Sequence, residues 1–181
     1  MENQKMHPRT NPPKDDLKCV IPVMRPVPGE GMRVVILSRH WVWLPTHYDG
    51  KRCVACPDDK TCQWCPKQVR AWKGFVVCRG LNGQRRVLLQ ITPNVVDNIS
   101  CELEEGEVLT GLMARFYRLG KERNSPLAAA VLGRRDGEQE VSVQETWTHV
   151  QRIFKLTSET LILSNADLGS PSFVFRPGLP S

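Results

Sequence analysis

The chain has 181 residues and a net charge of +6, from 25 lysine and arginine residues against 19 acidic ones. This length supports one main domain with a proper core, and the positive charge favours an acidic partner. No run of eighteen apolar residues occurs, and the first residues lack the apolar stretch of a secretory signal. These features exclude a helical membrane-spanning protein and lead us to expect a cytoplasmic one with reduced thiols.

Composition divides the chain into three expected segments. Residues 1–16 are polar and rich in proline, which predicts a flexible N-terminal arm. Residues 17–160 are expected to form the domain itself. Residues 161–181 are rich in serine, proline and glycine, which predicts an extended C-terminal tail.

The domain opens with two predicted strands, over residues 17–24 and 32–37, because both segments alternate or carry β-branched side chains. Residues 39–44 continue the second strand and place Arg39, Trp41 and Trp43 on one face. Pro45 is expected to end or bend that strand. The alternation alone leaves two interpretations open for the tryptophan face: a core face, or an exposed binding face.

Two Cys-x-x-Cys pairs follow this strand, formed by Cys53, Cys56, Cys62 and Cys65. Thiolates this close together in a cytoplasmic chain are typical of a tetrahedral zinc site. The residues between the pairs favour a turn, so we expect a metal-closed loop over residues 47–66. His47 is a fifth candidate ligand. Spacing slightly favours the four cysteines, with His47 as the alternative to Cys53.

The zinc is predicted to be structural. A catalytic zinc keeps an open position near a carboxylate, and neither His-x-Glu nor His-Glu-x-x-His occurs beside these cysteines. An iron–sulfur cluster is a weaker alternative because the ferredoxin spacings are missing, and disulfides rank last. Residues 67–73 have a helical pattern. The single cysteines Cys19, Cys78 and Cys101 are expected to be small buried side chains.

A β-hairpin is the clearest local prediction. Residues 75–78 and 86–91 are alternating apolar runs on either side of Asn82-Gly83, and Asn-Gly is the strongest short-range hairpin signal. Thr92-Pro93 then predicts the start of a short amphipathic helix over residues 94–99.

A second hairpin and a weaker helical pattern complete the domain. Residues 107–118 and 126–132 alternate apolar and polar side chains around a polar turn. Residues 141–156 have a weaker pattern, helical or mixed. Phe75 and Phe116 are expected in the core.

These elements predict a mostly β fold. A helix lies between the predicted third and fourth strands of the domain, and helices and strands do not alternate along the chain. That order favours a small OB-like barrel with a zinc-binding loop inserted in its first half and one or two short helices.

Positive charge is concentrated around the cysteines: residues 39–86 hold ten lysines or arginines and three aspartates. More cations lie on the hairpin over residues 107–132, and the two basic stretches are expected to converge into one groove. Single-stranded nucleic-acid binding needs cations for phosphates and aromatic faces for bases. The predicted contact residues are Arg39, Trp41, Trp43, Lys51, Arg52, Lys67, Arg70, Trp72, Lys73, Arg79, Arg115, Tyr117, Arg118, Lys121 and Arg123. For each of them, a role in the core or on a solvated surface is the alternative.

The motifs over about residues 30–135 resemble those of phage- and plasmid-type zinc-containing single-stranded-DNA-binding proteins, which destabilise double helices. The resemblance rests on Thr46-His47-Tyr48-Asp49-Gly50, Cys56, Cys62-Gln63-Trp64-Cys65-Pro66, Gly111-Leu112, Arg118-Leu119-Gly120 and Asn124-Ser125-Pro126-Leu127. It implies an OB-fold and a role in DNA replication or recombination in a bacterial or phage-infected cell.

The same resemblance implies a zinc set made of His47, Cys56, Cys62 and Cys65. This chain departs from the family pattern in two places. It offers Cys53 as an additional thiol, and its last residues, 168–181, contain no acid. Such proteins often end in an acidic tail that recruits partners.

We therefore expect a non-enzymatic protein that coats single-stranded DNA, or RNA, with little sequence preference. Its expected protein partners are replication or recombination proteins. The alternative is a zinc-containing adaptor that binds duplex nucleic acid or an acidic protein partner. A nuclease is disfavoured because no carboxylate cluster has metal-binding spacing.

Overall fold

A computed structural model describes residues 21–56, 62–104, 107–122 and 124–156 of the chain. The predicted arm (1–16) and tail (161–181) lie outside these described residues, as does Cys19. The elements in chain order are β1 (Val23–Met24), β2 (Met32–Ile36), β3 (Val42–Tyr48), β4 (Cys53–Ala55), β5 (Ala71–Gly80), β6 (Arg86–Ile91), α1 (Pro93–Ser100), β7 (Leu112–Arg118), β8 (Leu127–Arg134) and α2 (Val143–Phe154).

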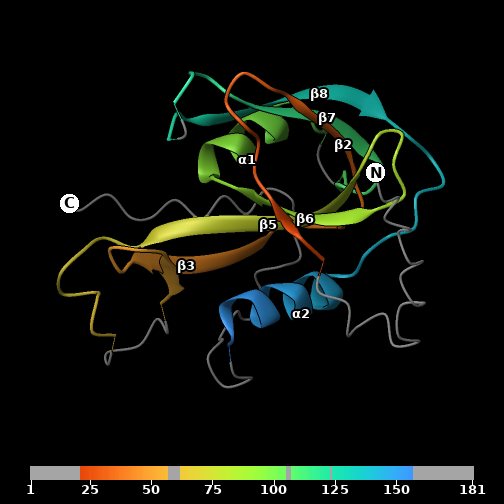
Figure 1. Cartoon of the computed structure of the whole chain (residues 1–181). Helices are drawn as coiled ribbons and strands as arrows, with labels where there is room; N and C mark the ends of the chain where they lie inside the picture. The colour runs from red at the N-terminus through yellow and green to blue at the C-terminus, as the bar shows by residue number, and fades with distance from the viewer. Residues whose placement is uncertain (1–20, 57–61, 105–106, 123, 157–181) are drawn as a thin grey trace, which may run out of the picture.

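All strands belong to one sheet in the order β1-β6-β5-β2-β7-β8, and β3 pairs with both β5 and β4. β2 and β3 pair with opposite ends of the long strand β5. The two predicted hairpins are confirmed as β5–β6 and β7–β8. In Figure 1, β3 and the first half of β5 extend away from the rest of the sheet. We call this extension, with β4 and the cysteine loop, the ribbon (residues 45–56 and 62–72), and the remainder the body.

The mostly β fold class is confirmed, and α1 lies between β6 and β7 as expected. The described sheet does not close into a barrel, because its edge strands β1 and β8 do not pair. Instead, the short strand β1 pairs in parallel with β6, with Val23 opposite Leu88. No helix in the described part of the chain is long and apolar enough to cross a membrane.

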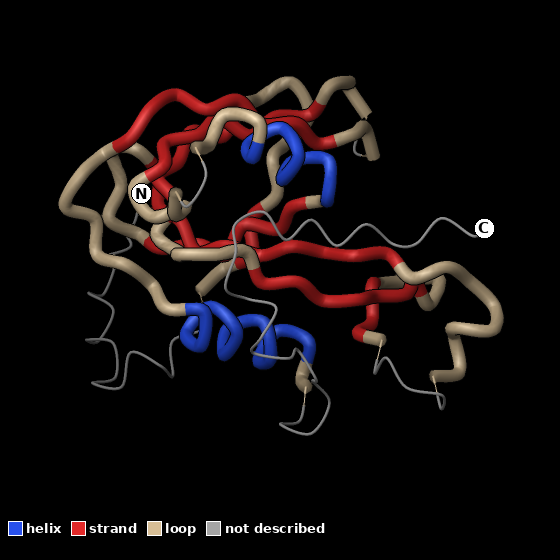
Figure 2. Tube along the Cα trace, turned by 180° about the vertical axis from the view of Figure 1, so that it is seen from behind, coloured by secondary structure: helices blue, strands red, loops and turns tan. Residues whose placement is uncertain are grey.

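The body has two hydrophobic cores, one on each face of the sheet. Successive strand residues point to opposite faces, so Val76 and Cys78 join the core beneath α1, whereas Phe75 and Val77 join the core beneath α2. Figures 1 and 2 show the two helices on opposite sides of the sheet. Phe75 and Phe116 are fully buried, as predicted.

Residues 141–156, whose sequence has only a weak helical or mixed pattern, contain the regular helix α2. The Ser142 hydroxyl accepts a hydrogen bond from the Glu145 N–H at 3.1 Å, which caps the start of α2. The helix ends at Lys155, whose φ of 54° is left-handed. Phe154 meets Phe75 edge to face, with ring centres 5.8 Å apart, and this contact fixes α2 on the sheet.

The predicted helix over residues 67–73 is wrong. The chain makes a single turn there, in which the Trp64 carbonyl accepts from the N–H groups of Lys67 and Gln68. β5 already begins at Ala71, because its first residues pair with β3. Pairing with a neighbouring strand has overridden the local helical pattern.

Pro45 does not end the second strand, since β3 continues through it to Tyr48. The Pro45 carbonyl accepts from the Cys56 N–H at 2.8 Å. The N and the carbonyl of one strand residue point to the same side, so the missing N–H of Pro45 faces away from β5. Its absence therefore costs no hydrogen bond to that strand.

Candidate metal centre and nucleic-acid interface

Three sulfurs and one imidazole meet in the ribbon. The ligand atoms of His47, Cys56, Cys62 and Cys65 all lie within 4.8 Å of one another. Cys56 Sγ is 3.5 Å from the sulfurs of Cys62 and Cys65, and Cys65 Sγ is 3.4 Å from His47 Nε2. A zinc tetrahedron with bonds of about 2.3 Å to sulfur places the sulfurs about 3.8 Å apart. The group therefore has the size and the donors to hold a metal ion such as zinc.

Strand geometry decides which residues reach this group. In the β3–β4 hairpin, Tyr48 is opposite Cys53 and His47 is opposite Val54. Opposite residues share a face and neighbours alternate, so Cys53 lies on the Tyr48 face. Cys56, two residues after Val54, lies on the His47 face. Spacing favoured Cys53, but the geometry brings His47 to the three sulfurs and leaves the half-buried Cys53 outside the group.

The turn between β3 and β4 fixes this register. The Asp49 carboxylate accepts from the N–H groups of Lys51 and Arg52, both at 2.8 Å. These hydrogen bonds lower the pKa of Asp49 and keep its carboxylate ionised, and the bond from Arg52 has the larger effect. Gly50 has a φ of 94°, a conformation that glycine adopts without strain. Because turn length sets register, this turn determines which side chains share the face of His47.

The second cysteine pair lies on a tight turn attached to β3. The backbone N–H groups of Trp64 and Cys65 donate to the sulfur of Cys62, which favours its thiolate. The Gln68 side chain accepts from the Tyr48 N–H at 3.3 Å and donates to the Tyr48 carbonyl at 3.0 Å. The turn is therefore held against β3, the strand that carries His47.

The protonation states of the four side chains bear on what the group can bind. Burial and the neighbouring thiols raise the pKa of Cys65 to about 12, and burial also raises the pKa of Cys56. For Cys62, burial is outweighed by the N–H donors, and its pKa is lowered. Burial, with Arg70 nearby, lowers the pKa of His47, so its imidazole is neutral at pH 7. A neutral imidazole beside clustered sulfurs is the donor set that a divalent metal ion binds.

The predicted nucleic-acid contacts fall into groups by exposure. Exposed side chains are Arg39, Lys51, Arg52, Lys67, Arg70, Arg115 and Lys121. Partly buried side chains are Trp43, Trp72, Lys73, Arg79, Tyr117 and Arg118. Trp41 is buried, and Arg123 lies outside the described residues.

Some of these side chains already serve the fold. Trp41 and Trp43 belong to the core beneath α1, so the tryptophan face of β3 is a core face and Trp41 offers no ring surface to a base. Arg79 forms an ion pair with Glu138, and their side chains are only 16% and 9% exposed. Arg79 is therefore committed to a partly buried pair rather than to a phosphate.

Other predicted residues lie together on exposed faces. The Arg115 guanidinium is 5.6 Å from the ring centre of Tyr117, and Lys67 Nζ is 5.9 Å from that of Trp64. Arg33, which no motif singled out, lies directly opposite Arg115 between β2 and β7. Its only sequence signal is a lone cation within a β-branched run. We call Arg33, Arg115 and Tyr117 the arginine face.

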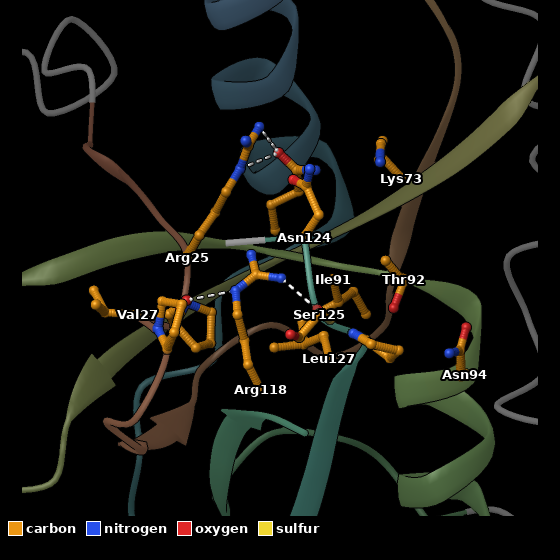
Figure 3. A pocket seen from close by; sticks show the side chains of 14 residues that line it. Arg25, Val27, Lys73, Ile91, Thr92, Asn94, Arg118, Asn124, Ser125 and Leu127 are labelled. Carbon is orange, nitrogen blue, oxygen red and sulfur yellow. Dashed lines mark hydrogen bonds between the residues drawn. The ribbon is translucent and has the colours of Figure 1, made fainter. Parts of the chain in front are cut away.

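One cation from each of the two basic stretches lines the same cavity. Lys73 comes from β5 and Arg118 from the end of β7, and the close-up in Figure 3 shows both side chains around this space. The expected convergence of the two stretches is thus limited to these residues in the described cavity.

Comparisons with protein-family models, curated proteins and solved structures found no match to this chain. The resemblance to phage- and plasmid-type single-stranded-DNA-binding proteins therefore stays a prediction. The geometry by itself establishes a mostly β domain with a His-Cys₃ group that can hold a metal ion.

Proposed function

We propose that this protein binds single-stranded DNA without catalysing a reaction, in replication or recombination, and that zinc at His47, Cys56, Cys62 and Cys65 keeps the ribbon in shape. The observation that carries the proposal is the arginine face on the outer side of β2 and β7. Its two cations and its aromatic ring match the two kinds of group that an unpaired strand presents, phosphates and bases.

The two arginines are placed where their positive charges repel each other across the sheet. Arg33 and Arg115 are direct cross-strand neighbours, and like charges in that arrangement destabilise a sheet. Within the described residues neither forms an ion pair, whereas Arg79, Arg86 and Arg134 each pair with a glutamate. An anionic ligand would remove the repulsion, and consecutive phosphates of a nucleic-acid strand supply such an anion.

Aromatic rings beside these cations favour a single strand over a duplex. Tyr117 lies under Arg115, and Trp64 lies under Lys67 in the ribbon. A base stacked on such a ring contributes about 1–3 kcal/mol, and only unpaired bases are free to stack there.

The donor set supports a structural zinc. Three thiolates and one imidazole complete a four-coordinate shell, and a structural site differs from a catalytic one in leaving no position for water. The ion would therefore hold the ribbon and carry no reaction.

The test is a fluorescence anisotropy titration of a labelled dT oligonucleotide at several salt concentrations. We expect the logarithm of affinity to fall with the logarithm of salt concentration, with a slope of about −0.7 per phosphate contact. Arg115→Gln should weaken binding by about threefold to tenfold and make the slope about 0.7 less steep.

Lys155→Gln is the matched control, because it removes one positive charge from the exposed residue after α2, a helix that packs on β3 and β5 rather than on the strands β2 and β7 of the arginine face. It should leave affinity nearly unchanged. An unchanged anisotropy signal at low salt would remove the proposal. Equal losses in the two variants would reduce the effect to net charge and would also count against it.

A second candidate function has its own support in the ribbon. Val69 is 92% exposed and Tyr48 is 56% exposed, and exposed apolar side chains beside cations are typical of a protein contact. The alternative is therefore an adaptor that binds duplex nucleic acid or an acidic protein partner. Unlabelled duplex that displaces the dT oligonucleotide as well as unlabelled single strand does would favour the adaptor.

A further inference from the structure

A cavity of about 740 Å³ lies between the end of β6 and the start of β8, two strands of the sheet that do not pair with each other. Its walls come from residues 25–28, from the β6–α1 junction and from the β7–β8 turn, as Figure 3 shows. The volume falls within the roughly 300–1,000 Å³ of small-ligand sites.

The described lining of this cavity contains three cations and no acid. The cations are Arg25, Lys73 and Arg118. Arg25 Nε donates to the side-chain carbonyl of Gln90 at 2.9 Å, and Arg118 donates to two backbone carbonyls at 3.0 and 2.7 Å. Neutral carbonyls orient a guanidinium without cancelling its charge, so the cavity keeps a positive potential.

One end of the cavity collects hydrogen-bond donors. Gly74 is opposite Ile91 in the β5–β6 register, so Lys73 comes opposite Thr92, the N-cap residue of α1. The Thr92 hydroxyl is buried, makes no cap bond and has no partner among the described residues. The Asn94 N–H belongs to the first turn of α1, whose donors have no acceptor within the helix. An ammonium, a hydroxyl and a helix N-terminus together suit a phosphate group.

The other polar lining groups suit a nucleobase. Gln90, Asn94 and Asn124 line the cavity with side-chain amides, which both donate and accept hydrogen bonds. Edges of unstacked bases are recognised by such groups. Val27 and Leu127 add apolar wall. Inorganic phosphate alone would use neither the amides nor the apolar wall.

We propose that this cavity binds one nucleotide unit, with its phosphate at Lys73, Thr92 and the N-terminus of α1 and its base toward the amide groups. The unit comes either from a bound strand or from a free nucleoside monophosphate, which share this chemistry. For the strand, the inference rests on the proposed function and deepens it by adding an anchoring site distinct from the arginine face.

The experiment is isothermal titration of the full chain with dTMP, with inorganic phosphate and with a dT oligonucleotide. The wild-type protein should bind dTMP more tightly than phosphate. Lys73→Gln should weaken dTMP binding by about tenfold, and Thr92→Val, which removes the hydroxyl and keeps the volume, by about threefold. Lys73→Arg should retain most of the affinity, and Lys155→Gln should retain all of it.

Circular dichroism shows whether each variant is folded. If Lys73→Gln does not fold, Thr92→Val is the variant whose affinity tests the proposal. Weaker binding of both dTMP and oligonucleotide in these variants would support the cavity. Oligonucleotide binding that depends on Arg115 but not on Lys73, with no dTMP signal, would overturn the cavity and leave the proposed function standing.

The remaining outcomes are also decisive. Binding of dTMP that requires Lys73, without any oligonucleotide binding, would support the cavity as a site for a free nucleotide and overturn the proposed function. Phosphate that binds as tightly as dTMP would overturn the nucleotide assignment. No binding of any ligand would overturn both proposals.

Discussion

The body and the ribbon belong to one sheet but are stabilised differently. The body buries apolar side chains on both faces, including Phe75 and Phe116. In the ribbon, by contrast, three of the buried side chains are His47, Cys56 and Cys62 of the candidate metal group. Burial stabilises by about 25 cal/mol per Å² of apolar surface, and the ribbon buries little of it. Its shape depends on hydrogen bonds and, in our proposal, on a metal ion held by the His-Cys₃ group.

This difference teaches that a continuous strand does not guarantee uniform stability. β3 and β5 run from the body into the ribbon, yet the contacts along them change from apolar packing to the His-Cys₃ group that can hold a metal ion. Local opening of one region without the other is the expected behaviour. Each of the following changes is expected to affect either the body or the ribbon, but not both.

Metal removal should have the largest effect, and it should be confined to the ribbon. Chelation, or Cys62→Ser, is expected to abolish zinc binding, because ligand binding in small zinc domains contributes about 10 kcal/mol or more. Hydrogen-exchange mass spectrometry should show loss of protection over residues 45–56 and 62–72 and retained protection in β6, β7 and β8. Equal loss in the body would contradict the separation of the two regions.

Phe75→Ala should destabilise the body by about 3–5 kcal/mol, because it opens a cavity at a fully buried site in contact with Phe154. Urea unfolding measures the change. Val69→Ala is the matched control in the ribbon: its side chain is exposed, and the free energy of unfolding should change by less than about 0.5 kcal/mol. A Phe75→Ala value as small as the control value would be incompatible with the described core.

Acid should weaken the body through His149. Burial lowers the pKa of this side chain below 6.5, and Arg152 and Arg86 add to the effect against Glu145. The unfolded chain then binds the proton more tightly, so stability is complete above about pH 6.5 and is lost as pH falls through the lowered pKa. Between pH 7.5 and about 5, the free energy of unfolding should fall less steeply for His149→Gln than for the wild-type protein. Urea unfolding at each pH measures it. Parallel pH profiles would remove His149 as the cause.

Cys53→Ser should have the smallest effect of the series. Cys53 lies outside the metal group, so zinc content should stay the same and stability should change by less than about 0.5 kcal/mol. Cys56→Ser, three residues away, should lose the metal. Mass spectrometry under native conditions distinguishes the two variants, and metal loss in Cys53→Ser would show that spacing had selected the correct ligand.

The parts of the fold that were predictable from sequence depend on local chemistry. Asn82-Gly83 identified the β5–β6 hairpin, and Thr92-Pro93 identified the start of α1. Turn and cap preferences act over a few residues, so they can be interpreted without knowing the neighbours. The mostly β class followed from the same signals.

The parts that were not predictable depend on register between distant strands. Whether Cys53 or His47 completes the metal group follows from the β3–β4 pairing, which requires a strand that continues through Pro45. The position of Arg33 opposite Arg115 requires the β2–β7 pairing, separated by about eighty residues. The burial of Trp41 likewise depends on which face of β3 packs beneath α1.

The turn at residues 49–52 has a consequence for how such a centre can change. One inserted residue there, with the hydrogen-bonded turn kept at its present length, would slip β4 by a single position. Cys53 would then come directly across from His47, and Cys56 would rotate to the opposite side of the hairpin. Loop length alone would thus exchange one thiol of the candidate metal group for another, without any change to His47 or to the cysteines themselves.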